Sequence, residues 1–143
     1  NRIREIASYF NAEMVICDKH RKRANEISSM VVIGDVTDRN VVLIDDICDT
    51  GGTLAKAAGL LKEKGARSVR ALCTHPVLSG NAYRNIENSV LEEMVVCDTL
   101  PLRAHSDKIK VLSVADLFAV AIKNAYHNQS ITSLFIHSQR RNK

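Results

Sequence analysis

The spacing of apolar residues along the chain predicts a succession of helices and strands. An amphipathic helix is expected at the start, because apolar residues recur there at i, i+3, i+4 and i+7; these are Ile3, Ile6, Ala7 and Phe10. Residues 14–17 and 41–44 are uninterrupted apolar runs. The second run is rich in β-branched residues, as in strands buried on both faces of a parallel sheet. Residues 54–61 return to helical spacing, and Gly65 follows as a stop signal.

The remaining chain repeats this order of strand and helix. Strands are expected at residues 68–73, 93–97 and 111–112, and a short helix at 81–86. A last helix begins near Ser113, whose hydroxyl caps it together with Asp116. Its expected buried face consists of Leu117, Phe118, Ala121, Ile122 and Ala125.

The order of these elements predicts an α/β fold, a mostly parallel sheet with helices on both faces in a three-layer, Rossmann-like arrangement. Neither an internal repeat nor a low-complexity linker divides the sequence. We therefore expect residues 1–143 to form a single domain, with residues 136–143 as a disordered polar tail.

Residues 18–29 depart from this pattern. They lack apolar periodicity, and every position from 19 to 23 is Lys, His or Arg. This predicts an exposed, mobile loop, closed by a short strand at residues 31–33. A solvated surface loop without a function is the alternative interpretation of the same charges.

Composition narrows the class of protein. Hydrophobic residues make up 45% of the chain and charged residues 25%, as in soluble globular proteins. No apolar stretch approaches the roughly 18 residues of a membrane span. The net charge of +4 favours a phosphate-rich partner, but the scattered aromatic residues offer no stacking platform for nucleic acid.

The cysteines and the first residue indicate the origin of the chain. Its four cysteines are widely spaced, which favours reduced thiols of a cytoplasmic protein over disulfides or a zinc site. The chain opens on Asn1, without a methionine or a leader of basic and then apolar residues. We therefore expect a piece of a longer protein.

The strongest chemical signal is the segment VVLIDDICDTGGTL, residues 41–54. Gly51 and Gly52 let the backbone approach a ligand closely, and the following helix directs its positive end to the same point. With the hydroxyls of Thr50 and Thr53 nearby, a phosphate group is the expected ligand. The carboxylates just upstream, Asp45 and Asp46, suit a pair of vicinal hydroxyls, reached directly or through a divalent cation.

A plain strand-to-helix turn is the alternative for this segment, because Gly, Asp and Thr are common in turns and caps. Two consecutive aspartates at the end of a buried strand argue against it, since buried carboxylates are costly unless they bind something. The sequence thus favours a sugar-phosphate site.

The same segment resembles the PRPP-binding motif of type I phosphoribosyltransferases (PRPP is phosphoribosyl pyrophosphate). Two further motifs, DKHRKRANE at residues 18–26 and THPVLSG at 74–80, resemble those of ribose-phosphate pyrophosphokinases. Similar matches are found at residues 98–102, 110–122 and 130–135. The chain is therefore identified as resembling the C-terminal domain of that family, with the type I phosphoribosyltransferase fold and without the N-terminal, ATP-binding half.

This resemblance implies a transferase, in which ATP and ribose 5-phosphate give PRPP and AMP for nucleotide biosynthesis, with Mg²⁺ as cofactor. It implies that Lys19 and Arg21 are catalytic and that Asp45 and Asp46 hold the ribose hydroxyls and the metal. Ribose 5-phosphate is further bound by Asp49, Thr50, Gly51, Gly52 and Thr53.

The resemblance also implies regulation and assembly. A regulatory site for inorganic phosphate and ADP would include Ser130, Thr132 and Phe135, for which a hydroxyl-rich tail packed by Phe135 is the alternative. The full enzymes are homo-oligomers, hexamers in this family. Neither a membrane nor nucleic acid is an expected partner.

We expect the chain alone to be inactive, because the family's ATP-binding residues lie in the missing half. A phosphoribosyltransferase that consumes PRPP is one alternative function. A non-catalytic, PRPP synthetase-associated regulatory protein is another. The sequence gives His75 no role, since a histidine before a proline at a strand end is often structural.

Overall fold

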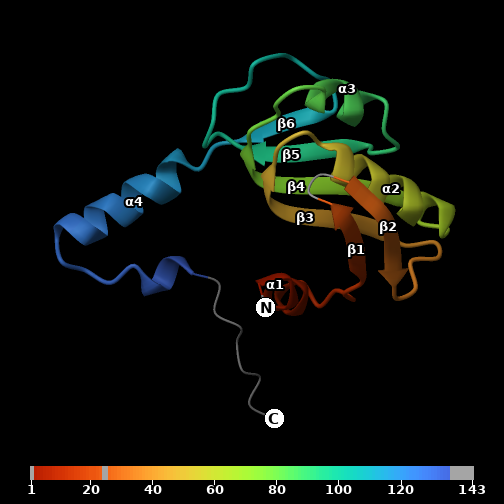
Figure 1. Cartoon of the computed structure of the whole chain (residues 1–143). Helices are drawn as coiled ribbons and strands as arrows, with labels where there is room; N and C mark the ends of the chain where they lie inside the picture. The colour runs from red at the N-terminus through yellow and green to blue at the C-terminus, as the bar shows by residue number, and fades with distance from the viewer. Residues whose placement is uncertain (1, 24–25, 136–143) are drawn as a thin grey trace, which may run out of the picture. The chain divides into compact units, whose positions relative to one another are not determined.

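The structure is a computed structural model that describes residues 2–23 and 26–135, and it divides the chain into two compact units (Figure 1). The described residues between 15 and 112 form the larger unit, and residues 2–14 with 113–135 are the described part of the smaller one. The expected disordered tail, residues 136–143, lies outside the described residues.

A parallel four-stranded sheet is the centre of the larger unit, as the sequence predicted. Its strands are ordered β3 (Asn40–Cys48), β4 (Ser68–Pro76), β5 (Glu93–Cys97) and β6 (Ile109–Leu112). Alternate residues of β4 are buried, which gives the sheet one strongly apolar face.

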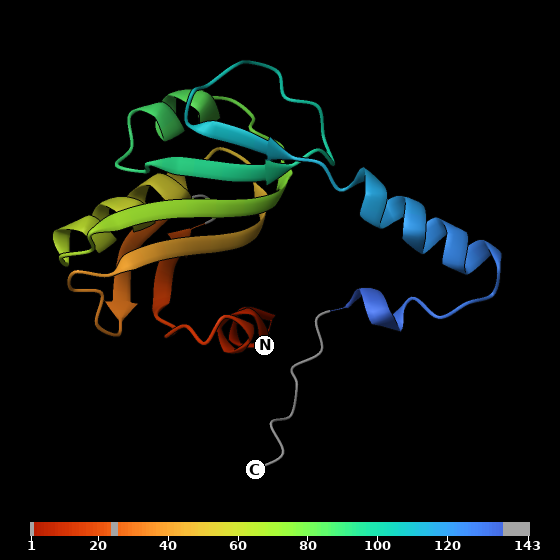
Figure 2. The same ribbon diagram turned by 180° about the vertical axis from the view of Figure 1, so that it is seen from behind.

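Helices α2 (Gly52–Glu63) and α3 (Ala82–Glu87) pack on that face and form the core with it. Figures 1 and 2 show both helices on the same side of the sheet. The completely buried side chains of the core include Ala58, Leu61, Ala82, Ile86, Val69, Met94 and Val96. Within this unit, the opposite face of the sheet carries exposed apolar residues, among them Val42, Leu72 and Leu112.

Strand β3 is longer than its apolar run predicted. Its pairing with β4 continues through Ile47–His75 and Cys48–Pro76. Asp45 and Asp46 therefore lie inside the last part of the strand and not just beyond it, although both side chains are exposed. The prediction stopped too early, because backbone pairing requires no apolar side chain once a neighbouring strand is in place.

The basic segment forms a hairpin and not the expected loop. Strands β1 (Ile16–Arg23) and β2 (Glu26–Ile33) pair antiparallel, with Ile16 opposite Ile33. The prediction of a loop was wrong because it considered the charged residues of the first strand alone. The β-branched residues of β2 favour a strand, and the backbone ladder then includes the basic positions opposite. Val32 joins the core and anchors the base of the hairpin.

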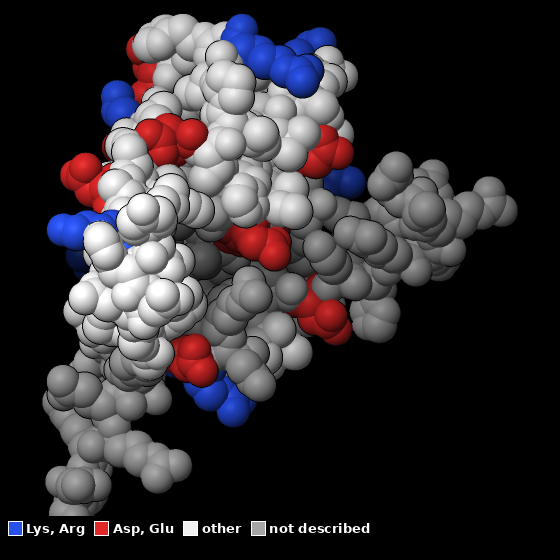
Figure 3. Space-filling view, turned by 90° about the vertical axis from the view of Figure 1, so that its left-hand side faces the viewer, with Lys and Arg blue, Asp and Glu red and all other residues white. Residues whose placement is uncertain are grey.

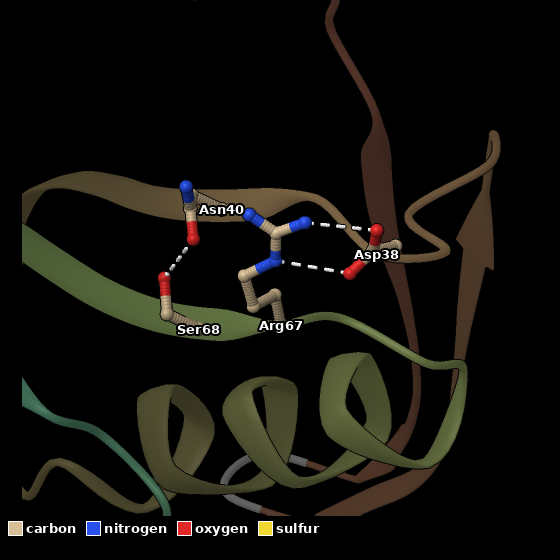
Figure 4. A network of polar contacts seen from close by, with 4 residues as sticks. All are labelled: Asp38, Asn40, Arg67 and Ser68. Carbon is tan, nitrogen blue, oxygen red and sulfur yellow. Dashed lines mark hydrogen bonds and ion pairs between the residues drawn. The ribbon is translucent and has the colours of Figure 1, made fainter.

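Polar contacts join the starts of β3 and β4, at the amino end of the sheet. The guanidinium of Arg67 donates two hydrogen bonds, of 2.9 and 2.8 Å, to the two carboxylate oxygens of Asp38. One residue further on, Ser68 donates its hydroxyl to the side-chain oxygen of Asn40 at 2.7 Å (Figure 4). The contacts fix the relative register of the two strands at the amino end.

The smaller unit contains α1 (Arg2–Tyr9), α4 (Ala115–Tyr126) and the short 3₁₀ helix η1 (Thr132–Leu134). The hydroxyl of Ser113 accepts a hydrogen bond from the N–H of Ala115 at 3.2 Å, but the N-cap residue of α4 is Val114, one position later than predicted. None of the described helices is long and apolar enough to cross a membrane.

The expected burial of α4 was wrong. Leu117, Phe118 and Ile122 are 49%, 56% and 67% exposed, and no residue of the helix is buried. Apolar periodicity predicts that a helix forms and which face is apolar. It carries no information on whether another element covers that face.

Candidate functional site: the glycine loop

The predicted phosphate-binding residues lie on the connection from β3 to α2, at the carboxyl end of the sheet. We call residues 49–53 the glycine loop. Open α/β sheets bind ligands at the carboxyl ends of their strands, so this is a favourable position for a site. Asp45 and Asp46 are close to it along β3, within the last four residues of that strand.

Residues 78–85, which we call the supporting segment, hold three consecutive backbone carbonyls at the start of the glycine loop, those of residues 48–50. Leu78 and Ser79 donate their N–H groups to the carbonyls of Cys48 and Asp49, at 3.1 and 3.0 Å. The side-chain amide of Asn85 donates to the carbonyl of Thr50 at 2.8 Å. Much of the supporting segment belongs to the family-like THPVLSG motif and the helix after it, so this motif has a physical task in shaping the loop.

The N–H groups of the same loop are left available. Within the described part of the chain, the N–H groups of Thr50, Gly52 and Thr53 donate no hydrogen bond. Those of Gly52 and Thr53 belong to the first turn of α2, where N–H groups have no partner inside the helix. With its carbonyls occupied and its amides open, the loop presents donors at the positive end of a helix, an arrangement that favours an anion.

The two glycines of the loop differ in their surroundings. Gly51 has φ of +69°, and a Cβ there would lie 3.4 Å from the carbonyl oxygen of Ala82 and from Ile86. Gly52 has no such conformation, and its nearest neighbours would be 3.8 Å or more from a Cβ. The fold therefore requires a glycine at position 51 but leaves room for a side chain at 52.

The three acids near the loop have different partners. Asp45 accepts the N–H of Asp46 at 2.9 Å through its carboxylate, and both side chains are exposed. The carboxylate of Asp49 accepts the hydroxyl of Ser79. Asp49 is thus tied to the supporting segment, while Asp45 and Asp46 remain accessible to a ligand. Among the described residues, no three His, Cys, Asp or Glu side chains gather closely enough to hold a metal by themselves.

Two buried thiols lie beneath the loop. Burial and the neighbouring Cys73 raise the pKa of Cys48 from 9.0 to about 11, although a backbone hydrogen bond from Gly51 opposes the shift. Burial likewise raises the pKa of Cys73. Both thiols consequently remain protonated at neutral pH, so neither adds a negative charge where an anion would bind.

The other predicted residues lie elsewhere. Lys19 and Arg21 are on β1, opposite Met30 and Ile27 of the hairpin. Ser130 and Thr132 belong to the smaller unit, where the Ser130 hydroxyl donates to that of Thr132 at 2.8 Å. Phe135, in the same unit, is 62% exposed. On the face drawn in Figure 3, the described Lys and Arg side chains are separated by acidic and uncharged residues.

Sequence reasoning missed Ser79 and Asn85, which hold the loop, and the pair formed by His75 and Thr99. The Nδ1 atom of His75 lies 3.0 Å from the hydroxyl of Thr99. Small polar residues directly after a strand end were the available signal. Their partners, however, are 24 to 35 residues away along the chain, a separation that no local pattern reveals.

Comparison with known proteins shows which families this chain resembles. The family described as "Phosphoribosyl synthetase-associated domain" matches residues 10–136. The proteins named ribose-phosphate pyrophosphokinase from Campylobacter jejuni and Wolinella succinogenes are each 55% identical over 135 residues, or 94% of this chain. The match covers 44% of either relative, so the chain spans less than half the length of these curated relatives.

A solved structure is similar as well. The crystal structure of phosphoribosylpyrophosphate synthetase from Mycobacterium smegmatis superimposes with a TM-score of 0.77 at 33% identity. This similarity covers 89% of the present chain and 42% of that protein. The parallel sheet with its flanking helices is thus the type I phosphoribosyltransferase fold expected from the sequence. The chain therefore belongs to the family described as "Phosphoribosyl synthetase-associated domain", whose model matches most of its length.

Proposed function

We propose that this chain is the part of a ribose-phosphate pyrophosphokinase that binds ribose 5-phosphate and the PRPP formed from it. The complete enzyme would transfer a diphosphoryl group from ATP to the sugar and release AMP. The observation that carries the proposal is the polarity of the glycine loop. The carbonyls of residues 48–50 are bound by the supporting segment, whereas, among the described residues, the N–H groups of Thr50, Gly52 and Thr53 are open.

In this proposal the 5-phosphate lies on the glycine loop, against the open N–H groups and the hydroxyls of Thr50 and Thr53. Gly51 gives the loop its conformation, and Gly52 allows the phosphate to approach closely. Asp49 acts through its backbone, because its carboxylate already accepts the hydroxyl of Ser79. A carboxylate held in that way keeps its charge away from the phosphate.

The ribose hydroxyls lie against the exposed carboxylates of Asp45 and Asp46. An ionised carboxylate has no proton to donate, so it can only accept hydrogen bonds from these hydroxyls. The same two carboxylates fit Mg²⁺. That ion is usually held by one or two carboxylates together with water and substrate phosphates, so a larger cluster of protein ligands is not needed. When bound, Mg²⁺ neutralises charge on the phosphates.

Lys19 and Arg21 are the proposed catalytic residues. Transfer of a phosphoryl group depends mainly on positioning and on neutralising the charge that develops on the transferred group. Fixed cations near that group are therefore expected to accelerate the step substantially. Both residues come from the hairpin strand β1, which leaves the core beside Val15 and Cys17.

The remaining assignments concern the complete enzyme. We propose regulation by inorganic phosphate and ADP through Ser130, Thr132 and Phe135, assembly into a homo-oligomer, and a cytoplasmic location. The proposed single domain of residues 1–143 is one half of that enzyme, and the other half supplies the ATP site. In support, the curated relatives named as this enzyme are more than twice as long.

The test is a titration of the chain with ribose 5-phosphate in the presence of Mg²⁺, followed by the backbone amide signals of residues 49–53 in NMR spectra. Saturable shifts confined to the loop and its surroundings are expected. Asp46→Ala should weaken binding about tenfold, the effect of losing a hydrogen bond to a charged group. Asp107→Ala is the matched control, because this exposed carboxylate lies just before β6, at the amino end of the sheet.

If the Asp46→Ala variant and the unaltered chain bind ribose 5-phosphate with equal affinity, the carboxylate of Asp46 does not bind the sugar. Consumption of PRPP that depends on an added nucleobase would instead favour a phosphoribosyltransferase. Unchanged affinity in the Asp107 control together with weaker binding in the Asp46 variant is the result that supports the present assignment.

A further inference from the structure

His75 and Thr99 bring together the carboxyl ends of β4 and β5. The hydroxyl of Thr99 lies 3.0 Å from Nδ1 of His75 and 2.9 Å from the backbone carbonyl oxygen of Thr74. The imidazole is exposed. The ring is thus held at one nitrogen while the rest of it faces outward at the ligand-binding end of the sheet.

These two contacts determine which nitrogen of the neutral ring carries the proton. A carbonyl oxygen only accepts hydrogen bonds, so the single hydroxyl proton of Thr99 must point to Thr74. The oxygen of Thr99 then has only lone pairs to offer to His75. Nδ1 must consequently be the donor, and Nε2 of the neutral ring carries a lone pair.

The imidazole comes from a backbone position close to Asp45. Asp45 pairs with Cys73, and His75 is two residues further along β4, opposite Ile47. Strand spacing and rise place the Cα atoms of Asp45 and His75 about 8 Å apart. One pentose ring between the two side chains bridges such a gap.

We propose that Nε2 of His75 accepts a hydrogen bond from a hydroxyl group of the bound pentose. The proposal rests on the proposed function and adds a specificity-determining residue to that site. A lone pair attracts a hydroxyl and repels a phosphate oxygen, so this nitrogen selects for the sugar and contributes nothing to anion binding. Thr99 acts through His75, as a positioning residue that fixes the tautomer.

The first measurement is a long-range ¹H–¹⁵N NMR spectrum of the histidine rings, in which protonated and bare ring nitrogens have different shifts. His75→Asn identifies the His75 signals by their disappearance. We expect a protonated Nδ1 and a bare Nε2 in the free chain, and a shift of the Nε2 signal when ribose 5-phosphate is added. Inorganic phosphate, which occupies the loop alone, should leave Nε2 unmoved.

The second measurement compares affinities. His75→Asn keeps an N–H near the position of Nδ1 but has no acceptor at Nε2. It should bind ribose 5-phosphate about tenfold more weakly and inorganic phosphate equally well. Thr99→Val, which removes the hydroxyl, should also weaken sugar phosphate binding, whereas Thr99→Ser should retain it.

The results separate this inference from the proposed function. An unaltered chain that binds neither ribose 5-phosphate nor phosphate overturns both. Ribose 5-phosphate binding that is equally tight in the His75→Asn variant overturns the role of His75 alone. A protonated Nε2 in the free chain, or protonation of the whole ring on addition of phosphate, also overturns it.

Discussion

Gly51 and Gly52 are adjacent, yet the structure requires a glycine at only one of them. The positive φ of Gly51 makes any side chain there strained, and its Cβ would also touch Ala82 and Ile86 at 3.4 Å. Gly52 begins a helix and has space around it. A glycine there has no structural reason, which points to the approach of a ligand as the reason for it.

Alanine at each position tests this difference. Gly51→Ala should lower the free energy of unfolding by about 1–3 kcal/mol, the cost of a side chain in a left-handed conformation. Gly52→Ala should leave stability equal or slightly higher, since alanine favours helices by up to about 1 kcal/mol. It should nevertheless weaken phosphate binding. Urea denaturation and a phosphate titration of both variants give the two quantities.

A Gly52→Ala variant that binds phosphate as tightly as the unaltered chain would show that the ligand does not approach this residue. Loss of stability in that variant, as large as in Gly51→Ala, would mean that position 52 is constrained by the fold after all.

The elements of the larger unit show where sequence patterns are informative. The parallel strands and α2 were predicted correctly because their own apolar residues form the sheet and the core, so the spacing of these residues is sufficient to identify them. The hairpin was missed because the pairing of β1 depends on β2, beyond the reach of a local pattern. The burial of α4 was wrong because periodicity cannot specify a partner surface.

The glycine loop was located by its own residues, but its shape depends on another element. Donors from the supporting segment set the direction of three consecutive carbonyls, those of residues 48–50. In the sequence these donors are ordinary residues, Leu78, Ser79 and Asn85. The position of the loop between β3 and α2 could therefore be predicted, whereas the contacts that orient its carbonyls could not.

Asn85 offers a test of this support. Asn85→Ala removes the side-chain donor to the carbonyl of Thr50 and should weaken phosphate binding several-fold, with a stability loss of about 1 kcal/mol. Asn88→Ala is the control, because Asn88 lies at the end of the same helix and its side chain is exposed. Calorimetric titration with phosphate measures the effect. Equal affinities of the two variants would contradict a role for α3 in shaping the loop.

At the scale of the molecule, the chain contains less than half of the length of its curated relatives. We place the sugar phosphate on the glycine loop of this chain and the ATP site in the other half. Binding of ribose 5-phosphate and complete turnover should therefore be separable properties in this family.

Activity measurements check that separation. The isolated chain, supplied with ATP, Mg²⁺ and ribose 5-phosphate, should form no PRPP above the background without protein, even where ribose 5-phosphate binding is saturated. Lys19→Ala should leave that binding unchanged, because the proposed role of Lys19 concerns the transferred group. Turnover by the isolated chain would place an ATP site within these 143 residues.

The hydrogen bonds from Leu78 and Ser79 to the carbonyls of Cys48 and Asp49 also affect how fast backbone amides exchange with solvent. These two amides are released only when the supporting segment separates from the loop. A phosphate that binds the loop in the conformation held by the supporting segment must suppress that separation as well. Deuterium uptake at Leu78 and Ser79 should consequently slow on phosphate binding, although neither amide contacts the ligand, and the two segments should open as one cooperative unit.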